Sequence, residues 1–255
     1  MHIRFLGTHN AESKNTRLSS FLIDGILAVE TGNLTTGLSF SEQEKIQTIL
    51  LSHGHYDHIR GLPAFAFNNY HRTTRVFAHQ DTLDVVTSHL MDGLIYPRFN
   101  QKTDFTDKPA LELLPLELFK AYQINGYRIQ ALPVNHSITA TGFEIYKDGK
   151  SLFYTGDTGP GLHALWDHIS PQCIIMDLTY PNSAEKAAWD AGHLCPDLLK
   201  NELMKFQQVK GYLPRVILIH LSPRFEKEIR REVLQAAAEL ETTIDIAPEG
   251  NELIM

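Results

Sequence analysis

Short apolar segments separated by polar turns dominate the first thirty residues of the chain. Asp24 and Gly25, between two of these segments, are a strong β-hairpin signal. The pattern then changes to apolar strands that alternate with stretches whose apolar residues recur at helical spacing. The predicted strands cover residues 3–6, 20–23, 26–29, 46–51, 75–78, 127–134, 141–146, 151–155, 173–176, 215–219 and 243–246. The predicted helices cover residues 59–70, 80–91, 161–168, 196–206 and 226–240.

Strands and helices occur in two successive rounds along the chain. This order is typical of α/β proteins, and it predicts two sheets packed face to face with helices outside. Residues 92–118 interrupt the pattern, with three prolines and with aromatic residues scattered through polar sequence. We interpret them as an inserted lid or dimer-contact segment. We expect residues 1–255 to form a single domain that contains this insertion.

The most informative polar stretch directly follows the predicted strand 46–51. Three histidines and an aspartate fall within six residues: His53, His55, Asp57 and His58. Imidazole and carboxylate are the natural ligands of zinc, manganese and iron. If the strand ends just before them, His53 and His55 can bind one ion, while Asp57 and His58, in the turn beyond, reach a second. A histidine-rich surface loop is the simpler alternative, but four ligand-type residues at this spacing favour a metal site.

Three further ligand-type residues also follow predicted strands. His136 comes after the strand 127–134, Asp157 after 151–155, and His220 directly after 215–219. Taken singly, each also fits a loop residue, a turn former or a buried histidine. Together with the first cluster they meet the full requirement of a two-metal hydrolase, with one carboxylate left to bridge the ions.

Composition and charge narrow the choice of compartment and partner. The two cysteines, Cys173 and Cys195, cannot form a disulfide framework. The net charge of −7 disfavours long contacts with nucleic acid but allows a small anionic substrate. No apolar run approaches the roughly twenty residues that span a bilayer, and the N-terminus lacks a signal-peptide pattern. We therefore expect a cytoplasmic protein without a membrane partner.

The HxHxDH stretch, followed in order by His136, Asp157 and His220, resembles the metallo-β-lactamase superfamily of metal-dependent hydrolases. The resemblance covers nearly the whole chain. It implies a four-layer αβ/βα sandwich with a dinuclear metal site at the sheet edge. It also implies two divalent ions, with zinc expected and manganese or iron as alternatives. The implied ligands are His53, His55 and His136 for one ion, Asp57, His58 and His220 for the second, and Asp157 as the bridge.

Residues 177–182 and 192–194 point to one chemistry within the superfamily. A carboxylate at a strand end, an aromatic-Pro-Asn turn and Gly-His-Leu before a helix resemble the class II cyclic-nucleotide phosphodiesterases. In these enzymes, and in tRNA 3′-processing endonucleases, this histidine belongs to the phosphodiester site, which implies such a role for His193. The chain departs from the pattern at Cys195, where a small hydroxylated residue is usual, and at Tyr56, where an apolar residue is frequent. The alternative for His193 is a residue that merely precedes a helix.

These features predict hydrolysis of a 3′,5′-cyclic nucleotide to the 5′-monophosphate by a hydroxide that the metals hold. Asp57 is the candidate to orient or deprotonate the water, and His193 is the candidate to bind the phosphate or protonate the leaving oxygen.

A tRNA-processing endonuclease is the first alternative function. The segment 92–118 is slightly acidic and has a single glycine, which counts against RNA binding. The remaining alternatives are another hydrolase of the superfamily, such as a lactamase, thioesterase or sulfatase, and a non-catalytic, metal-stabilised sensor or scaffold. The resemblance also implies a homodimer.

Overall fold

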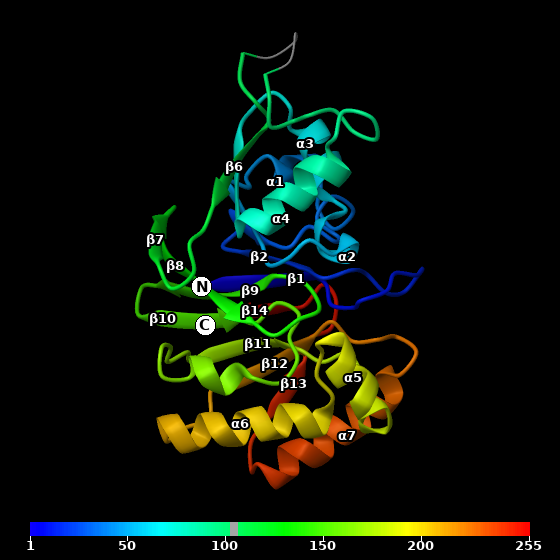
Figure 1. Cartoon of the computed structure of the whole chain (residues 1–255), viewed down its shortest axis with the longest axis vertical. Coiled ribbons are helices and arrows are strands. Elements are labelled where there is room, and N and C mark those ends of the chain that lie inside the picture. Colours follow the sequence, from blue (N-terminus) through cyan, green and yellow to red (C-terminus); the bar gives the residue numbers. More distant parts are fainter. Residues whose placement is uncertain (103–106) are drawn as a thin grey trace.

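Two seven-stranded sheets form the centre of the computed structural model, which describes residues 1–102 and 107–255. In Figure 1 the short helices α1 to α4 gather at one end of the molecule and the helices α5 to α7 at the other, with the sheets between them. This arrangement confirms the predicted four-layer sandwich.

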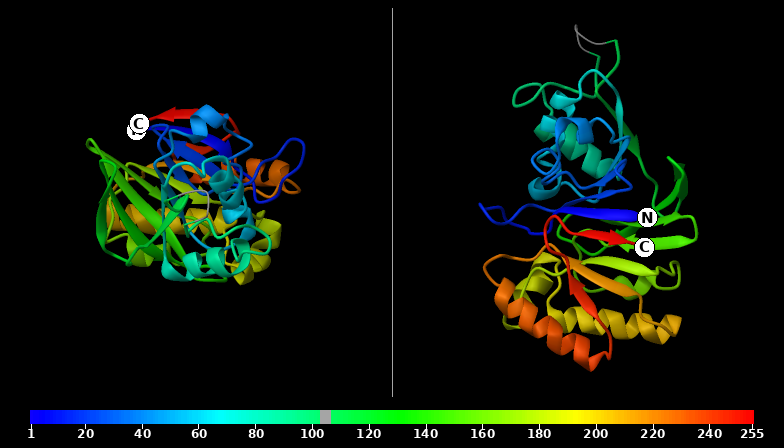
Figure 2. Two further views of the ribbon diagram at one scale, coloured as in Figure 1. Left: turned by 90° about the horizontal axis from the view of Figure 1, so that it is seen from above. Right: turned by 180° about the vertical axis from the view of Figure 1, so that it is seen from behind.

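The first sheet comes mainly from the N-terminal half of the chain. Its strands pair in parallel from β3 to β6, whereas the pairs β14-β1, β1-β2 and β2-β3 are antiparallel. In spatial order the strands are β14 (Glu252–Ile254), β1 (His2–Gly7), β2 (Ser20–Ile23), β3 (Leu27–Val29), β4 (Thr48–Leu51), β5 (Thr74–Ala78) and β6 (Leu111–Pro115). The helices α3 (Leu62–Asn68) and α4 (Gln80–Val85) cover its outer face with apolar side chains. The pairing of β1 with β14 places the two chain ends side by side (Figure 2).

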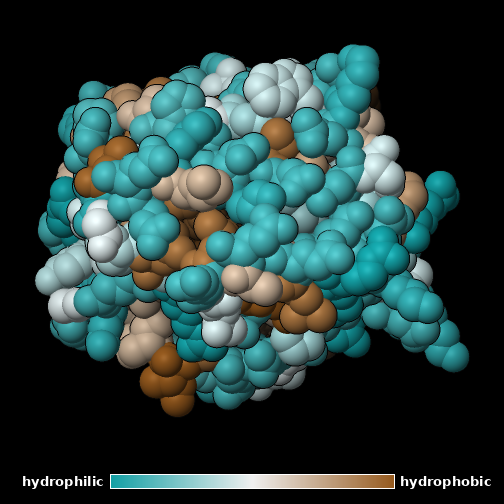
Figure 3. Space-filling model, turned by 90° about the horizontal axis from the view of Figure 1, so that it is seen from below, coloured by the Kyte–Doolittle hydropathy of each residue, from teal (hydrophilic) through white to brown (hydrophobic). Residues whose placement is uncertain are grey.

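The second sheet carries the longest helices. The pairs from β10 to β13 are parallel and the others are antiparallel. In spatial order the strands are β13 (Ile244–Ile246), β12 (Arg215–Ile219), β11 (Cys173–Asp177), β10 (Lys150–Tyr154), β9 (Ala140–Lys147), β8 (Tyr127–Val134) and β7 (Ala121–Ile124). Helices α6 (Pro196–Lys210) and α7 (Glu226–Glu239) bury their apolar faces on this sheet. Their outward side is mainly hydrophilic, with small scattered apolar patches (Figure 3).

Apolar side chains of both sheets meet in a shared core. The ring of Phe21 on β2 packs edge-on against Tyr154 on β10, with ring centroids 5.1 Å apart. Ile129 and Ile175 of the second sheet are fully buried in the same cluster. Burial of one such side chain contributes about 1.5–3 kcal/mol to stability. The core therefore holds the sheets together and gives the sheet edge a rigid support.

A charged contact also links the two sheets. Asp24, in the turn between β2 and β3, accepts a hydrogen bond of 2.6 Å from the hydroxyl of Tyr127 and one of 2.8 Å from Nζ of Lys147. Burial by itself raises the pKa of Asp24, but the bonds from Lys147, Tyr127 and the backbone of His2 lower this pKa to about 2. The carboxylate is therefore ionised in the folded protein at neutral pH.

Several predicted elements have the expected bounds. The strands at 20–23, 127–134 and 215–219 are confirmed residue for residue. Two helices, α2 (Tyr56–Ile59) and α3, replace the single helix predicted for 59–70. Gly61 lies between them, and it approaches a neighbouring backbone so closely that a Cβ would lie 2.1 Å from the carbonyl oxygen of Thr31.

The segment 92–118 is not irregular throughout. Strand β6 lies within it, pairs in parallel with β5 and forms the edge of the first sheet. The prediction of irregular structure is therefore wrong for Leu111–Pro115, whereas a role as a lid or dimer contact stays a prediction. A single strand of five residues that ends in proline gives only a weak signal in a polar sequence. The remainder of the segment includes residues 103–106, which lie outside the described residues.

Other differences concern short elements. The helix predicted for 161–168 is a 3-10 turn at Leu162–Leu165, and the one predicted for 80–91 continues beyond α4 as a π-helical turn at Val86–Leu90. Elements of about two helical turns or fewer show too little periodicity to be recognised. The elements that the sequence did not reveal include α1 (Phe40–Gln43), α5 (Glu185–Ala191), β6, β7 and β14.

A search of the described residues finds no helix with both the length and the apolar character required to cross a membrane.

Candidate metal centre

The seven predicted ligand residues come together at one edge of the sandwich. His53 lies just beyond β4, His136 beyond β8, Asp157 beyond β10 and His220 beyond β12. The structure therefore places these four residues past the carboxyl ends of strands, as the sequence indicates.

The stretch after His55 differs in one respect from the prediction. Asp57 and His58 belong to the short helix α2, whereas the sequence predicted a loop turn at this position. They still reach the same edge of the sandwich, because α2 begins directly after His55.

The first cluster combines three histidines and one aspartate, His53, His55, His136 and Asp157, whose ligand atoms lie within 4.8 Å of one another. Nε2 of His136 is 3.1 Å from Nδ1 of His55, and Nε2 of His53 is 3.6 Å from Oδ2 of Asp157. The side chains thus face each other with the nitrogen and oxygen atoms whose lone pairs can bind a metal ion.

The second cluster shares Asp157 with the first. Its members, Asp57, His58, Asp157 and His220, also have ligand atoms within 4.8 Å. Oδ1 of Asp157 lies 3.2 Å from Nε2 of His58, and Oδ2 lies 3.3 Å from Nε2 of His220. Nε2 of His220 is also 3.1 Å from Oδ2 of Asp57. Because Oδ2 of Asp157 also lies 3.6 Å from Nε2 of His53, this carboxylate faces both clusters.

The donors fit divalent cations. Nε2 of His53 is buried and has no hydrogen-bond partner among the described residues. An unpaired buried polar atom costs about 1–3 kcal/mol, so such atoms need an explanation. A cation bound between convergent imidazoles and carboxylates supplies the missing partner, and this donor set suits zinc, manganese or iron.

Burial sets the protonation of the first cluster. Desolvation lowers the pKa of His53 well below its ordinary value, and it also lowers the pKa values of His55 and His136. These imidazoles are therefore neutral at physiological pH. Neutral imidazole is the form that binds metals.

The second cluster has a strong negative field. Burial by itself lowers the pKa of His220, but Asp157, Asp177 and Asp57 raise it to about 10. Burial likewise lowers the pKa of His58, and the carboxylates of Asp157, Glu30 and Asp57 outweigh it and raise that pKa well above the ordinary value. The carboxylates therefore attract positive charge to this position, and a divalent ion competes there with protons.

Groups behind the first cluster fix two of its imidazoles. Oγ of Ser52 lies 2.9 Å from Nδ1 of His53, and the carbonyl oxygen of Gly192 lies 2.9 Å from Nδ1 of His136. A proton on Nδ1 that is held in this way leaves the lone pair on Nε2 directed at the cluster.

Glu30 supports the second cluster. This glutamate is fully buried at the end of β3 and has a φ angle of 60°, a left-handed backbone conformation that is uncommon for glutamate. Its Oε1 accepts a hydrogen bond of 3.1 Å from the backbone N–H of Ser52, and its Oε2 lies 3.6 Å from Nδ1 of His58. Glu30 therefore places a carboxylate behind His58.

A third group of polar residues adjoins His220. Oδ2 of Asp177 lies 2.9 Å from Nδ1 of His193, and Oδ1 lies 3.2 Å from Nδ1 of His220. The hydroxyl of Thr179 donates to Oδ1 of Asp177 at 2.7 Å and lies 2.8 Å from Nδ1 of His220. The ring of His193 stacks on that of His220, with centroids 5.3 Å apart. His193 therefore lies directly beside the second cluster of candidate ligand residues.

The sequence did not assign roles to Asp177, Glu30, Ser52 or Thr179. Asp177 ends a strand as the predicted ligands do, so its position was a usable signal. Glu30 is a charged residue at the end of an apolar strand, which is the other signal that was present.

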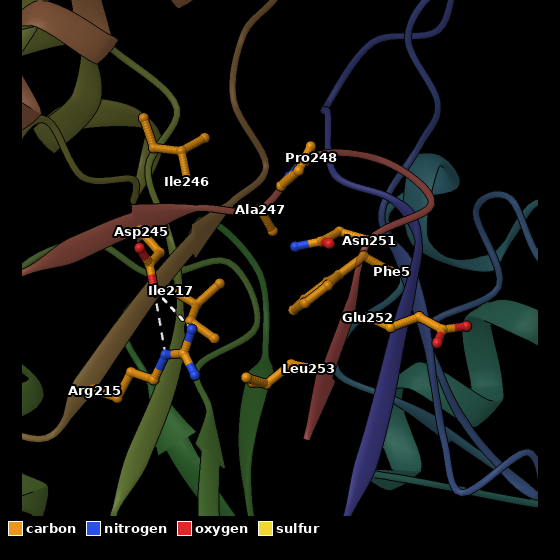
Figure 4. Close-up of a pocket in the computed structure, with 10 residues that line it drawn as sticks. All are labelled: Phe5, Arg215, Ile217, Asp245, Ile246, Ala247, Pro248, Asn251, Glu252 and Leu253. Carbon is orange, nitrogen blue, oxygen red and sulfur yellow. Dashed lines mark hydrogen bonds and ion pairs between the residues drawn. The ribbon is translucent and has the colours of Figure 1, made fainter. Parts of the chain in front are cut away.

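A pocket elsewhere contains none of the predicted site residues. It has a volume of about 200 Å³ and lies between the edge strands β13 and β14 (Figure 4). Phe5, Ile217 and Leu253 form part of its apolar wall, and the charged Arg215 and Asp245 pair with each other at 3.0 Å. This pocket therefore offers no ligand cluster.

The sandwich fold and the clustered histidines and aspartates define the protein as a metal-dependent hydrolase. A family model described as the beta-lactamase superfamily domain matches residues 20–221, and the chain belongs to this family.

Individual proteins resemble the chain at lower identity. A probable 3′,5′-cyclic-nucleotide phosphodiesterase of Yersinia pestis is 25% identical over 221 residues, which cover 75% of this chain and 62% of that protein. Ribonuclease Z of Methanocaldococcus jannaschii is 23% identical over 290 aligned positions, which cover 89% of this chain and 88% of that protein. The crystal structure of unliganded yeast PDE1 matches with a TM-score of 0.85 at 18% identity, over 100% of this chain and 99% of that chain.

Proposed function

We propose that this protein is a phosphodiesterase that hydrolyses a 3′,5′-cyclic nucleotide to the 5′-monophosphate with two divalent ions, preferably zinc. The observation that carries the proposal is the position of His193, which Asp177 holds beside His220 at the edge of the second cluster. The name of the Yersinia pestis relative supports the same substrate class.

In this proposal the two clusters hold one ion each. When bound, such ions neutralise charge on the phosphoryl oxygens and make the attacking water easier to deprotonate. The ligands are His53, His55 and His136 for the first ion, Asp57, His58 and His220 for the second, and Asp157 for both.

His193 is the proposed general acid. Hydrolysis forms a bond from a water oxygen to phosphorus and breaks the bond from phosphorus to O3′, so the departing O3′ needs a proton. Nδ1 of His193 donates to Asp177, which leaves Nε2 to contact the phosphate or to protonate O3′. A positioned acid of this kind contributes about 100- to 10,000-fold to the rate.

Asp57 is the proposed partner of the attacking water. Its Oδ2 lies 3.1 Å from Nε2 of His220, so one carboxylate oxygen is held at the second cluster. The other oxygen can accept a hydrogen bond from the water and orient it toward phosphorus.

A ribonuclease Z-like activity is the second candidate. The relative from Methanocaldococcus jannaschii favours it, because the match extends over most of both chains. A linear diester needs the same ligands and the same proton donor, so the two candidates differ in substrate and not in chemistry. A homodimer and a single domain over residues 1–255 remain part of the proposal.

The test is an assay of purified, metal-quantified protein. The substrates are 3′,5′-cyclic AMP, GMP, CMP and UMP, with bis-p-nitrophenyl phosphate and a tRNA precursor beside them. We expect rapid opening of at least one cyclic nucleotide. Cleavage of the tRNA precursor in preference to every cyclic nucleotide would favour the second candidate. Protein that binds metal and cleaves no diester would overturn both.

A further inference from the structure

Gly192 ends α5 in a conformation that few other residues adopt. Its φ angle of 71° and ψ angle of 44° are left-handed, and the N–H groups of Gly192 and His193 donate to the carbonyls of Trp189 and Ala188 at 3.2 and 2.8 Å. This pattern is a glycine-terminated helix end. It turns the chain so that Gly192 and His193 both face the two clusters of candidate ligand residues.

Gly192 also approaches the backbone of His136 very closely. A Cβ at this position would lie 2.7 Å from Cα of His136 and 3.0 Å from the backbone nitrogen of Ser137. The close approach brings the carbonyl oxygen of Gly192 to 2.9 Å from Nδ1 of His136. Only glycine satisfies both the backbone conformation and the lack of space.

The next residue contacts the other cluster. His193 bonds to Asp177, and the same carboxylate lies 3.2 Å from Nδ1 of His220. The rings of His136 and His193 are 5.0 Å apart. Two consecutive residues therefore contact supports of both clusters, one through a carbonyl and the other through a shared carboxylate.

We propose that Gly192 is a positioning residue that orients His136 for metal binding and ties this orientation to the placement of His193. This inference rests on the proposed metal binding. Loss of a group that orients a metal ligand lowers metal affinity by about 10- to 100-fold. Any side chain at position 192 must displace His136 and should therefore weaken the binding of metal at the first cluster.

The experiment compares Gly192→Ala with Gly211→Ala. Gly211 ends α6 with a φ angle of 74°, and a Cβ there would meet nothing within 4 Å. Both variants therefore place a Cβ on a residue with a left-handed φ angle, but only the first moves His136. Zinc affinity is measured by competition with a chromogenic chelator, and bound zinc per chain by mass spectrometry. We expect about a 10- to 100-fold loss of affinity in Gly192→Ala and none in Gly211→Ala.

An asparagine variant separates strain from displacement. Asparagine tolerates the left-handed conformation but still carries a Cβ. Gly192→Asn should therefore bind zinc as weakly as Gly192→Ala. Recovery of wild-type affinity in Gly192→Asn, or equal affinity in Gly192→Ala and Gly211→Ala, would overturn the inference while the proposed function stands. Wild-type protein that binds no zinc would overturn the proposed function as well.

Hydrogen exchange provides a test that needs no variant. Removal of zinc from the wild-type protein frees His136, so the amide of His193 should exchange faster. The amide of Gly211, which donates to the carbonyl of Gln207 at 2.8 Å, should not change. Equal exchange of the His193 amide with and without zinc would contradict the proposed link between the orientation of His136 and the placement of His193.

Discussion

The carboxylate of Asp177, at the end of β11, lies 2.9 Å from Nδ1 of His193, in the loop between α5 and α6. Burial raises the pKa of Asp177, but the neighbouring His193 and His220 outweigh this effect and lower it below the ordinary value. Asp177 is therefore an ionised, buried acceptor that fixes the ring of His193 through Nδ1 and leaves Nε2 for the proposed contact with the substrate.

Replacement of His193 by alanine should reduce kcat by about 100- to 10,000-fold, because the leaving oxygen loses its proton donor. Bound metal should not change, since the two ligand clusters do not include His193 in the proposed assignment. The exposed His71 provides the control, and His71→Ala should retain full activity. Undiminished turnover in His193→Ala would remove this residue from the mechanism.

Replacement of Asp177 by asparagine should impair both histidines that it contacts. His193 faces Oδ2 of Asp177 and His220 faces Oδ1, so in asparagine one of the two histidines meets an NH2 donor in place of an acceptor. We expect a lower kcat and about a 10- to 100-fold weaker second metal site. Metal titration and steady-state kinetics measure the two effects. The matched variant Asp245→Asn, at a solvent-exposed ion pair with Arg215, should change neither. A normal second site in Asp177→Asn would show that His220 needs no support from Asp177.

Replacement of Glu30 by glutamine tests the support of His58. The carbonyl oxygen of the new side chain can still accept from the N–H of Ser52, so the fold should persist. Its amide NH2 group, however, would replace Oε2 and face Nδ1 of His58. If Nδ1 carries a proton, two hydrogen-bond donors would then oppose each other. We expect about a 10- to 100-fold loss of affinity for one ion, measured by chelator competition. Glu117→Gln, at an exposed position, is the control. Two sites of unchanged affinity would exclude a positioning role for Glu30.

Replacement of Asp24 by asparagine should change the pH dependence of stability. The folded-state pKa of about 2 lies below the ordinary value of 3.8, so the ionised carboxylate stabilises the fold above about pH 4. This contribution is lost as pH falls through the folded-state pKa. With allowance for solvent screening it amounts to about 1–2 kcal/mol.

Urea unfolding of metal-free protein between pH 7 and pH 2 measures this contribution. The gap in free energy of unfolding between wild type and Asp24→Asn should narrow as the pH falls. Asp148→Asn, in an exposed turn beside Lys147, should follow the wild-type profile. A gap that stays constant across this range would show that Asp24 makes no pH-dependent contribution.

The sequence by itself determined the sandwich and the residues at its strand ends. Apolar runs mark strands locally, and His53, His136, Asp157 and His220 follow such runs directly. Because a side chain just past a strand lies at the carboxyl edge of a sheet, the local pattern already indicates which side chains can meet there. The structure brings these four residues to one edge of the sandwich for this reason.

Only the tertiary structure decided how these residues are supported. The contacts of Gly192 with His136, of Glu30 with His58 and of Asp177 with both His193 and His220 join segments that are 16 to 56 residues apart in the chain. No local periodicity encodes such contacts. They arise from the order in which the strands pair and from the close approach of backbones, which are properties of the packed chain and not of any one segment.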